Sequence, residues 1–243
     1  MKEQNGSSRA SVFGIDIGKN VFHVVGVDVG GQPVQKARFR RESLLQFFER
    51  TAPALIGMES CPGSQWLARK LIALGHRVRI IPAQFVKPYV KSNKNDVADA
   101  EAICEAVARP SMRFVPVKSV EQQSVLSLHR ARQGFVIART AQANQIRSLL
   151  GEFGLVIPKG ISHVTKQVPR LLDDASNQLP GVLRQLITRL SEHLKDLDKL
   201  VDELEMQIKA WHRSSELSLR LEKIPGIGPL GASALVASIA DAN

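Results

Sequence analysis

The sequence predicts an α/β protein, in which a mixed sheet with helices packed on it is followed by long helices. Short β-rich segments separated by tight turns occupy residues 12–40. Strand-like and helix-like segments then alternate over residues 43–81. Beyond residue 119 the segments are long and helical, with regularly spaced apolar residues. These three observations indicate a sheet-forming part and a separate helical part.

The first part is expected to start with three antiparallel strands, because only short turns join them. They are Val12–Gly18, Val21–Val29 and Val34–Arg40. Strands and helices alternate after them, which indicates parallel strands and hence a mixed sheet. These later elements are a helix near Ser43–Arg50, a strand from Ala54 to Met58, a helix from Ser64 to Leu74, a strand from Arg77 to Ile81 and a helix running to Ala108.

The helical part carries a heptad pattern. A long helix is expected over Ser119–Leu150, then a connector over Gly151–Pro180 with at most short helices. In Leu183–Trp211 the apolar residues recur at alternating steps of four and three, which predicts a coiled coil or a long two-helix packing. We expect this seam to pack on a second subunit, with the helix Ser119–Leu150 as the alternative. The predicted organisation is a disordered tail over 1–10, a sheet domain over 11–117, a helical region over 118–215 and a helix-hairpin-helix-like tail over 216–243.

The charge of the chain is unevenly distributed. The net charge of +10 divides into +7 for residues 1–115, +4 for 116–180 and −1 for 181–243. A basic excess over the first 180 residues is expected of a protein that contacts a polyanion such as DNA or RNA. There is no apolar run of membrane-spanning length and no signal-peptide pattern, so we expect a cytoplasmic protein without a membrane partner. The two cysteines, Cys61 and Cys104, are expected to be buried free thiols.

Four carboxylates stand out by position. Asp16 interrupts an apolar strand, and Glu59 ends a central strand. Asp96 and Asp99 have an i, i+3 spacing that places both on one face of a helix. Carboxylates gathered from two strands and a helix form the kind of cage that Mg²⁺ prefers. An alternative for the last two is helix capping, with Asp96 as the N-cap and Asp99 as a first-turn acid.

Three motifs carry a resemblance to a known family. Gly14-Ile-Asp16-Ile-Gly-Lys19, Gly57-Met-Glu59-Ser60 and Asn95-Asp96-Val-Ala-Asp99-Ala100 occur in this order. Together they resemble the Asp-Glu-Asp-Asp (RuvC-like) nuclease domain of the insertion-sequence-110 transposases, a family that includes pilin-gene invertases. The tail Ile224-Pro-Gly-Ile-Gly-Pro229 is similar to the opening of that family's second domain.

The resemblance implies an RNase H-like fold and metal-dependent DNA strand cleavage and exchange directed by a structured guide RNA. Asp16, Glu59, Asp96 and Asp99 would then be catalytic and would bind two Mg²⁺ (or Mn²⁺) ions. It also implies a nucleophilic serine within a Ser- and Gly-rich motif, which is absent up to Asn243. Ser233 and Ser238 lie in a small-residue helix and are not assigned this role. We therefore expect this polypeptide to bind nucleic acid but not to complete strand exchange alone.

Basic and glycine residues are candidates for nucleic-acid binding. A turn such as Ile224–Leu230 exposes backbone N–H groups that can hold a phosphate, although it also fits a plain interhelical turn. The arginines of Ser119–Leu150 form either a DNA or RNA surface or a solvated helix face. His23, His129, His163 and His193 show no metal-ligand spacing and receive no role. The nucleic-acid-binding candidates are Lys19, Lys94, Arg130, Arg132, Arg139, Arg147, Lys223, Gly226 and Gly228.

The predicted function is that of a transposase or site-specific recombinase acting on DNA as a homo-oligomer, a dimer or tetramer. A junction-resolving nuclease of the RNase H fold is an alternative, but a minimal resolvase needs neither the heptad segment nor the hairpin tail. A non-catalytic nucleic-acid-binding remnant of a transposase is another. An actin-like kinase or ATPase should show a second phosphate-binding Asp-Gly loop, which the sequence lacks.

Overall fold

The computed structural model describes residues 10–90 and 96–239, and the chain divides into two compact units, Met1–Ser119 and Val120–Asn243. The expected disordered tail lies outside the described residues up to residue 9, as does Lys94.

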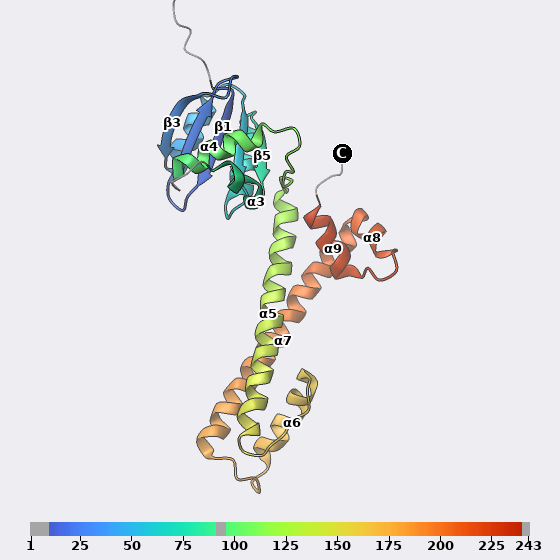
Figure 1. Ribbon diagram of the computed structural model, residues 1–243. Coiled ribbons are helices and arrows are strands. Elements are labelled where there is room, and N and C mark those ends of the chain that lie inside the picture. Colours follow the sequence, from blue (N-terminus) through green and yellow to red (C-terminus); the bar gives the residue numbers. More distant parts are fainter. Residues whose placement is uncertain (1–9, 91–95, 240–243) are drawn as a thin grey trace, which may run out of the picture. The chain divides into compact units, whose positions relative to one another are not determined.

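The first unit is built on a five-stranded mixed sheet (Figure 1). Its strand order is β3-β2-β1-β4-β5. β1 pairs antiparallel with β2, and β2 pairs antiparallel with β3, while β4 and β5 run parallel to β1. This order and these directions confirm the predicted RNase H-like α/β fold. The strands are β1 (Val12–Ile17), β2 (Phe22–Val27), β3 (Pro33–Phe39), β4 (Leu55–Glu59) and β5 (Arg77–Ile81).

Helices cover both faces of the sheet. On one face, α1 (Arg41–Glu49) and α2 (Ser64–Ala73) pack on the largest apolar cluster, which contains Phe13, Ile15 and Met58. On the other face, α3 (Ala83–Val86), the 3₁₀ turn η1 (Lys87–Tyr89) and α4 (Asp96–Val107) pack on a second set of buried residues. Alternate residues of each strand face alternate layers, so residues two apart in β1 share a face.

Two glycines bring α4 close to the sheet. Gly14 of β1 and Gly57 of β4 are register partners in neighbouring parallel strands. A Cβ atom built on Gly14 would lie 2.1 Å from the carbonyl oxygen of Ala100, and one on Gly57 would lie 2.8 Å from Cβ of Val107. Only a residue without a side chain allows this approach. The helix therefore lies directly over β1 and β4. Asp16 and Glu59 are the next residues after these glycines on the same face of the sheet.

The second unit is built on two long helices, α5 (Val120–Gly151) and α7 (Gly181–Ser214), which pack side by side (Figure 1). Seam residues of α7 such as Ile187, Leu194, Val201 and Ile208 are buried. Of the two partners considered for the seam, the structure shows the helix of the same chain. A second subunit would have to contact another surface, because the seam is already covered.

Salt bridges fix the register of the two helices. The Arg132 guanidinium binds Glu205 at 2.5 Å, and Arg139 pairs with Asp198. Arg139 follows Arg132 by one heptad, whereas its partner Asp198 precedes Glu205 by one heptad. The two helices are therefore antiparallel. The Trp211 indole N–H donates to Glu121 at 2.6 Å near the end of the pair.

The connector between the long helices contains more structure than we expected. It forms α6 (Ile161–Asp173), a three-turn helix whose residues Val164 and Val168 are buried against α5 and α7. The prediction of at most short helices was wrong here. The proline- and glycine-rich flanks and Pro169 inside the helix are typical of loops, and they made its apolar periodicity hard to recognise in the sequence. Arg184 of α7 stabilises the end of this connector by donating to the carbonyls of Leu172 and Asp174.

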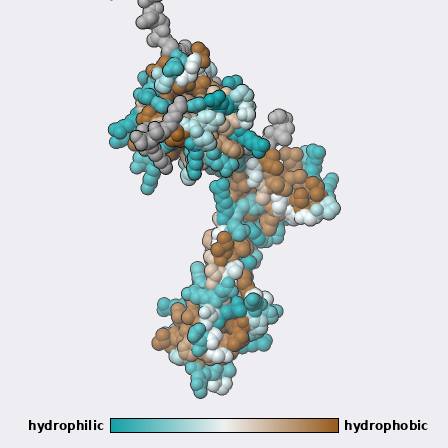
Figure 2. All heavy atoms as spheres, viewed as in Figure 1, coloured by the Kyte–Doolittle hydropathy of each residue, from teal (hydrophilic) through white to brown (hydrophobic). Residues whose placement is uncertain are grey.

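The tail forms α8 (Glu216–Glu222) and α9 (Pro229–Ser238), joined by the predicted glycine-rich turn. In the second unit α9 contacts α5, α7 and α8. Apolar surface gathers over α8 and α9 (Figure 2). The exposed apolar residues in this part are Leu217, Leu219, Ile224, Leu235 and Ile239. Among the described residues, no helix has the length and apolar character of a membrane span.

Candidate metal centre

Asp16 and Glu59 occupy equivalent positions in neighbouring parallel strands. Each lies two residues after one of the close-packed glycines, so each shares the sheet face that α4 covers. Asp16 is half-buried, with 27% of its side chain exposed, and Glu59 is partly buried at the end of β4. Parallel strands bring their carboxyl ends to the same edge of a sheet, which places the two acids near each other.

The helix α4 supplies the other two acids from its first turn, which contains both Asp96 and Asp99. The donor atoms of Asp16 and Asp96 lie within 4.8 Å of each other, together with one from His23. The structure has Asp96 as the first residue of α4 rather than its N-cap, so the capping alternative is wrong for Asp96, while Asp99 is a first-turn acid as expected. A first-turn carboxylate can also face the sheet, so this position of Asp99 is compatible with the arrangement.

The electrostatics of Asp16 reflect all four acids. Burial raises the pKa of Asp16, and the negative charges of Asp96, Asp99 and Glu59 raise it further, while His23 lowers it. Glu59 and Asp16 also contribute, after burial, to the raised pKa of the Cys61 thiol. A cation bound among charges that repel one another would favour their ionised forms.

His23 is the residue of this cluster that sequence reasoning missed. The Gly18 N–H donates to the Val21 carbonyl in a tight turn between β1 and β2, and this turn places His23 opposite Asp16. The hairpin register was the signal that could have found it, since residues equally distant from a short turn face each other. Spacing along one strand cannot reveal a donor atom that comes from the neighbouring strand.

Some of the other predicted nucleic-acid-binding residues are exposed, and others bind partners within the second unit. Lys19, Arg130, Lys223, Gly226 and Gly228 are exposed. The guanidinium groups of Arg132 and Arg139 form the ion pairs with α7, so these two are not a freely solvated face, and their binding to nucleic acid stays a prediction. Arg147 donates to the Ile157 carbonyl at 3.1 Å and to the Asn144 side chain.

The two serines of the tail helix α9 and the two cysteines differ in burial. Ser233 is fully buried, and its hydroxyl donates to the Pro229 carbonyl at 2.7 Å, whereas Ser238 is exposed. Cys104 is buried against β2, and burial raises the pKa of its thiol to about 12. The expectation of buried thiols is confirmed for Cys104, while Cys61 is only partly buried.

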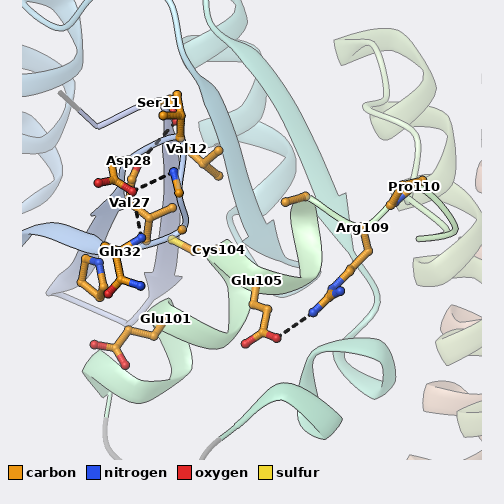
Figure 3. Close-up of a pocket in the computed structure, with 15 residues that line it drawn as sticks. Ser11, Val12, Val27, Asp28, Gln32, Glu101, Cys104, Glu105, Arg109 and Pro110 are labelled. Carbon is orange, nitrogen blue, oxygen red and sulfur yellow. Dashed lines mark hydrogen bonds and ion pairs between the residues drawn. The ribbon is translucent and has the colours of Figure 1, made fainter. Parts of the chain in front are cut away.

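A cavity of about 610 Å³ lies beside the C-terminal half of α4 and the β2–β3 turn (Figure 3). Its polar residues include Asp28, Glu101, Glu105 and Arg109, and Glu105 pairs with Arg109 at 2.8 Å. The four predicted acids of the metal centre do not line it. It is therefore a separate feature of the first unit.

Comparisons with known proteins agree with the fold and the acidic motifs. Residues 13–154 match a family model described as a transposase, the IS110 type with a DEDD motif. A probable family 20 transposase of Pseudomonas aeruginosa is 45% identical over 234 residues, which are 96% of this chain and 69% of that protein. The transposase for IS1328 of Yersinia enterocolitica is 42% identical over 95% of this chain and 68% of its own length.

A more distant relative extends this agreement. The transposase for IS1111A of Coxiella burnetii is 35% identical over 99% of this chain and 66% of its own length. The match therefore includes the sheet, the acidic motifs and the long helices rather than one local motif. The chain belongs to the IS110 family of transposases.

Proposed function

We propose that this chain cleaves DNA strands during transposition, using divalent metal held by Asp16, Glu59, Asp96 and Asp99. The observation that carries the proposal is the placement of these acids: Asp16 and Glu59 lie at the carboxyl ends of adjacent parallel strands, one residue before the end of β1 and at the end of β4, and two acids lie in the first turn of the helix packed over them. The sheet and the glycine contacts hold the acids in place, so little reorganisation is needed when a cation enters.

The donor set fits a divalent cation. Carboxylate oxygens are the ligands that Mg²⁺ and Mn²⁺ prefer, and the mutual repulsion that raises the pKa of Asp16 would be relieved by positive charge. The Nδ1 atom of His23, buried without a hydrogen-bond partner among the described residues, faces the same space. Two bound metal ions would activate the attacking oxygen and stabilise the leaving oxygen of the phosphodiester. Lys19 is exposed in the turn after Asp16, where its charge would neutralise a neighbouring phosphate.

Nucleic-acid binding is assigned to exposed groups of the chain. Arg130 is exposed on α5 and can meet a phosphate, whereas Arg132, Arg139 and Arg147 already bind partners within the second unit. In the tail, Gly226 has a φ of +89° and Gly228 is the N-cap of α9. This geometry, with Lys223 nearby in the chain, supports the phosphate-binding proposal for the turn.

We further propose, from the family, that a structured guide RNA directs the reaction in the cytoplasm and that the protein acts as a homo-oligomer. The basic excess of residues 1–180 supports binding to RNA as well as to DNA. Because α5 covers the heptad seam, the exposed apolar residues of α8 and α9 are a more suitable surface for a second subunit.

The test is metal-dependent cleavage of branched DNA by the wild type and by Asp16→Asn and Glu59→Gln. Each variant should lose about a hundredfold or more of the cleavage rate while retaining DNA affinity, since the carboxylates serve chemistry rather than binding. Glu49→Gln, an exposed acid on α1, is the control and should cleave normally. Equal cleavage by wild type and Asp16→Asn, or cleavage that persists in a chelator, would contradict the proposal.

A further inference from the structure

His23 lies within the metal centre although it belongs to none of the three acidic motifs. It is directly opposite Asp16 in the β1–β2 pair, on the face that α4 covers. Its Nδ1 atom is 3.4 Å from an Asp96 carboxylate oxygen and 4.0 Å from an Asp16 oxygen. Only 16% of the side chain is exposed, so the imidazole is held between two carboxylates from different elements.

The Nδ1 atom has no hydrogen-bond partner among the described residues, although it is buried. A buried polar atom without a partner costs stability, and native structures seldom contain one without a functional reason. The Asp96 oxygen at 3.4 Å forms an ion pair only with a protonated imidazole and makes no hydrogen bond to Nδ1, and the Asp16 oxygen at 4.0 Å is too distant for one. A cation between the three side chains would satisfy this nitrogen and both carboxylates together.

The spacing of the donors suits an octahedral ion. Ligand atoms about 2.1 Å from such an ion lie about 3 Å apart when adjacent and about 4.2 Å apart when opposite. The donor atoms of Asp16, His23 and Asp96 lie within 4.8 Å of one another, so small movements bring all three into the first coordination sphere. An imidazole ligand favours transition metals over Mg²⁺, which prefers oxygen.

We propose that His23 binds the catalytic divalent metal through Nδ1, together with Asp16 and Asp96, and gives the site a preference for Mn²⁺ over Mg²⁺. This inference rests on the proposed function, since it adds a nitrogen ligand to the same centre. The site thus contains a ligand from β2 in addition to those from β1, β4 and α4.

The experiment uses the full chain with Mn²⁺ as the probe, because Mn²⁺ is paramagnetic and its binding is followed by electron paramagnetic resonance without any cleavage assay. Pulsed spectra report nitrogen hyperfine coupling when an imidazole is bound. His23→Asn keeps a side chain of similar shape but removes the imidazole. His23→Asp places a carboxylate oxygen where Nδ1 was. His193→Asn, an exposed histidine of α7, is the matched control.

The expected result is nitrogen coupling in the wild type and in His193→Asn that is lost in both His23 variants. His23→Asn should bind Mn²⁺ on the order of tenfold more weakly, while Mg²⁺ affinity, measured by competition, changes by less than about threefold. His23→Asp should regain metal affinity with a shift in preference toward Mg²⁺, a recovery that a merely structural role for His23 would not produce.

Two other outcomes separate this inference from the proposed function. In the first outcome, the wild type binds Mn²⁺ without nitrogen coupling and Asp16→Asn loses this binding, or the coupling survives in His23→Asn. Either finding would overturn the role of His23 and leave the carboxylate site intact. Mn²⁺ binding that is insensitive to Asp16→Asn would overturn the metal centre itself, and the inference with it.

Discussion

At the scale of single residues, Gly14 determines how closely α4 approaches the sheet. The place of its missing side chain is occupied by the Ala100 carbonyl oxygen and the Cys104 backbone nitrogen. Any side chain there would push away the helix that carries Asp96 and Asp99. The glycine two residues before Asp16 therefore influences the position of the candidate metal centre through the helix α4.

We predict that Gly14→Ala lowers the free energy of unfolding by about 3 kcal/mol, because its Cβ would overlap backbone atoms that cannot move aside. Gly134→Ala is the control. Gly134 lies inside α5 with no atom near its Cβ position, so alanine should stabilise by about 0.5–1 kcal/mol. Chemical denaturation measures both values. A Gly14→Ala protein as stable as the wild type would show that α4 does not press on β1.

A second single-residue prediction concerns pH. His129 on α5 contacts the Ser233 hydroxyl of α9 at 3.1 Å, and burial, followed by the charge of Arg132, lowers the pKa of His129. The unfolded chain therefore takes up this proton more readily than the folded chain. Stability should be complete above the ordinary histidine pKa of 6.5 and should decrease as the pH falls below it.

The measurement is hydrogen exchange of α9 amides at about pH 7.5 and about pH 5.5. After correction for intrinsic exchange rates, protection in the wild type should decrease at the lower pH. His129→Gln should remove this acid-induced loss, whereas His193→Gln, at an exposed position, should retain it. An equal loss in His129→Gln would assign the effect to another group.

At the scale of elements, the α5–α7 pair combines a buried apolar seam with flanking salt bridges. The apolar spacing predicts the helices and their seam, but the ion pairs of Arg132 and Arg139 specify the antiparallel alignment. Burial of the apolar seam permits only registers that differ by whole heptads, because these bury the same kind of residue. The charged residues beside the seam then distinguish among these registers. Arginines that looked like a nucleic-acid surface thus act within the fold.

We predict that Arg139→Glu lowers the free energy of unfolding by about 1 kcal/mol, because it places like charges together beside the seam. Combining it with Asp198→Arg should restore most of the loss by recreating the pair in reverse. Arg130→Glu, on the same helix but exposed, should change stability little. Denaturant unfolding of the four proteins checks this. A double variant no more stable than Arg139→Glu would indicate that the pair contributes nothing.

At the scale of the whole molecule, the net charge of +10 predicts that nucleic-acid binding by this chain depends on salt. Each phosphate neutralised releases counterions, so the logarithm of the affinity for duplex DNA should fall with the logarithm of salt concentration at a slope of about −0.9 per contact. Arg130→Ala should weaken binding and flatten the slope by about one contact.

Arg189→Ala, in the net-negative last part of the chain, is the control and should leave the slope unchanged. Fluorescence anisotropy at several salt concentrations gives both slopes, and equal slopes in wild type and Arg130→Ala would exclude Arg130 from the interface.

The sequence by itself determined the strands and most helices of the molecule and marked its four acids, because apolar periodicity and a charge inside an apolar strand are local signals. It could not predict α6, whose apolar face is hidden by prolines, or the intramolecular partner of the heptad seam. Only the tertiary structure brought His23 to Asp16 and paired Arg132 and Arg139 with α7. These contacts join residues that are distant along the chain or on opposite strands, and such pairings depend on register and packing rather than on local composition.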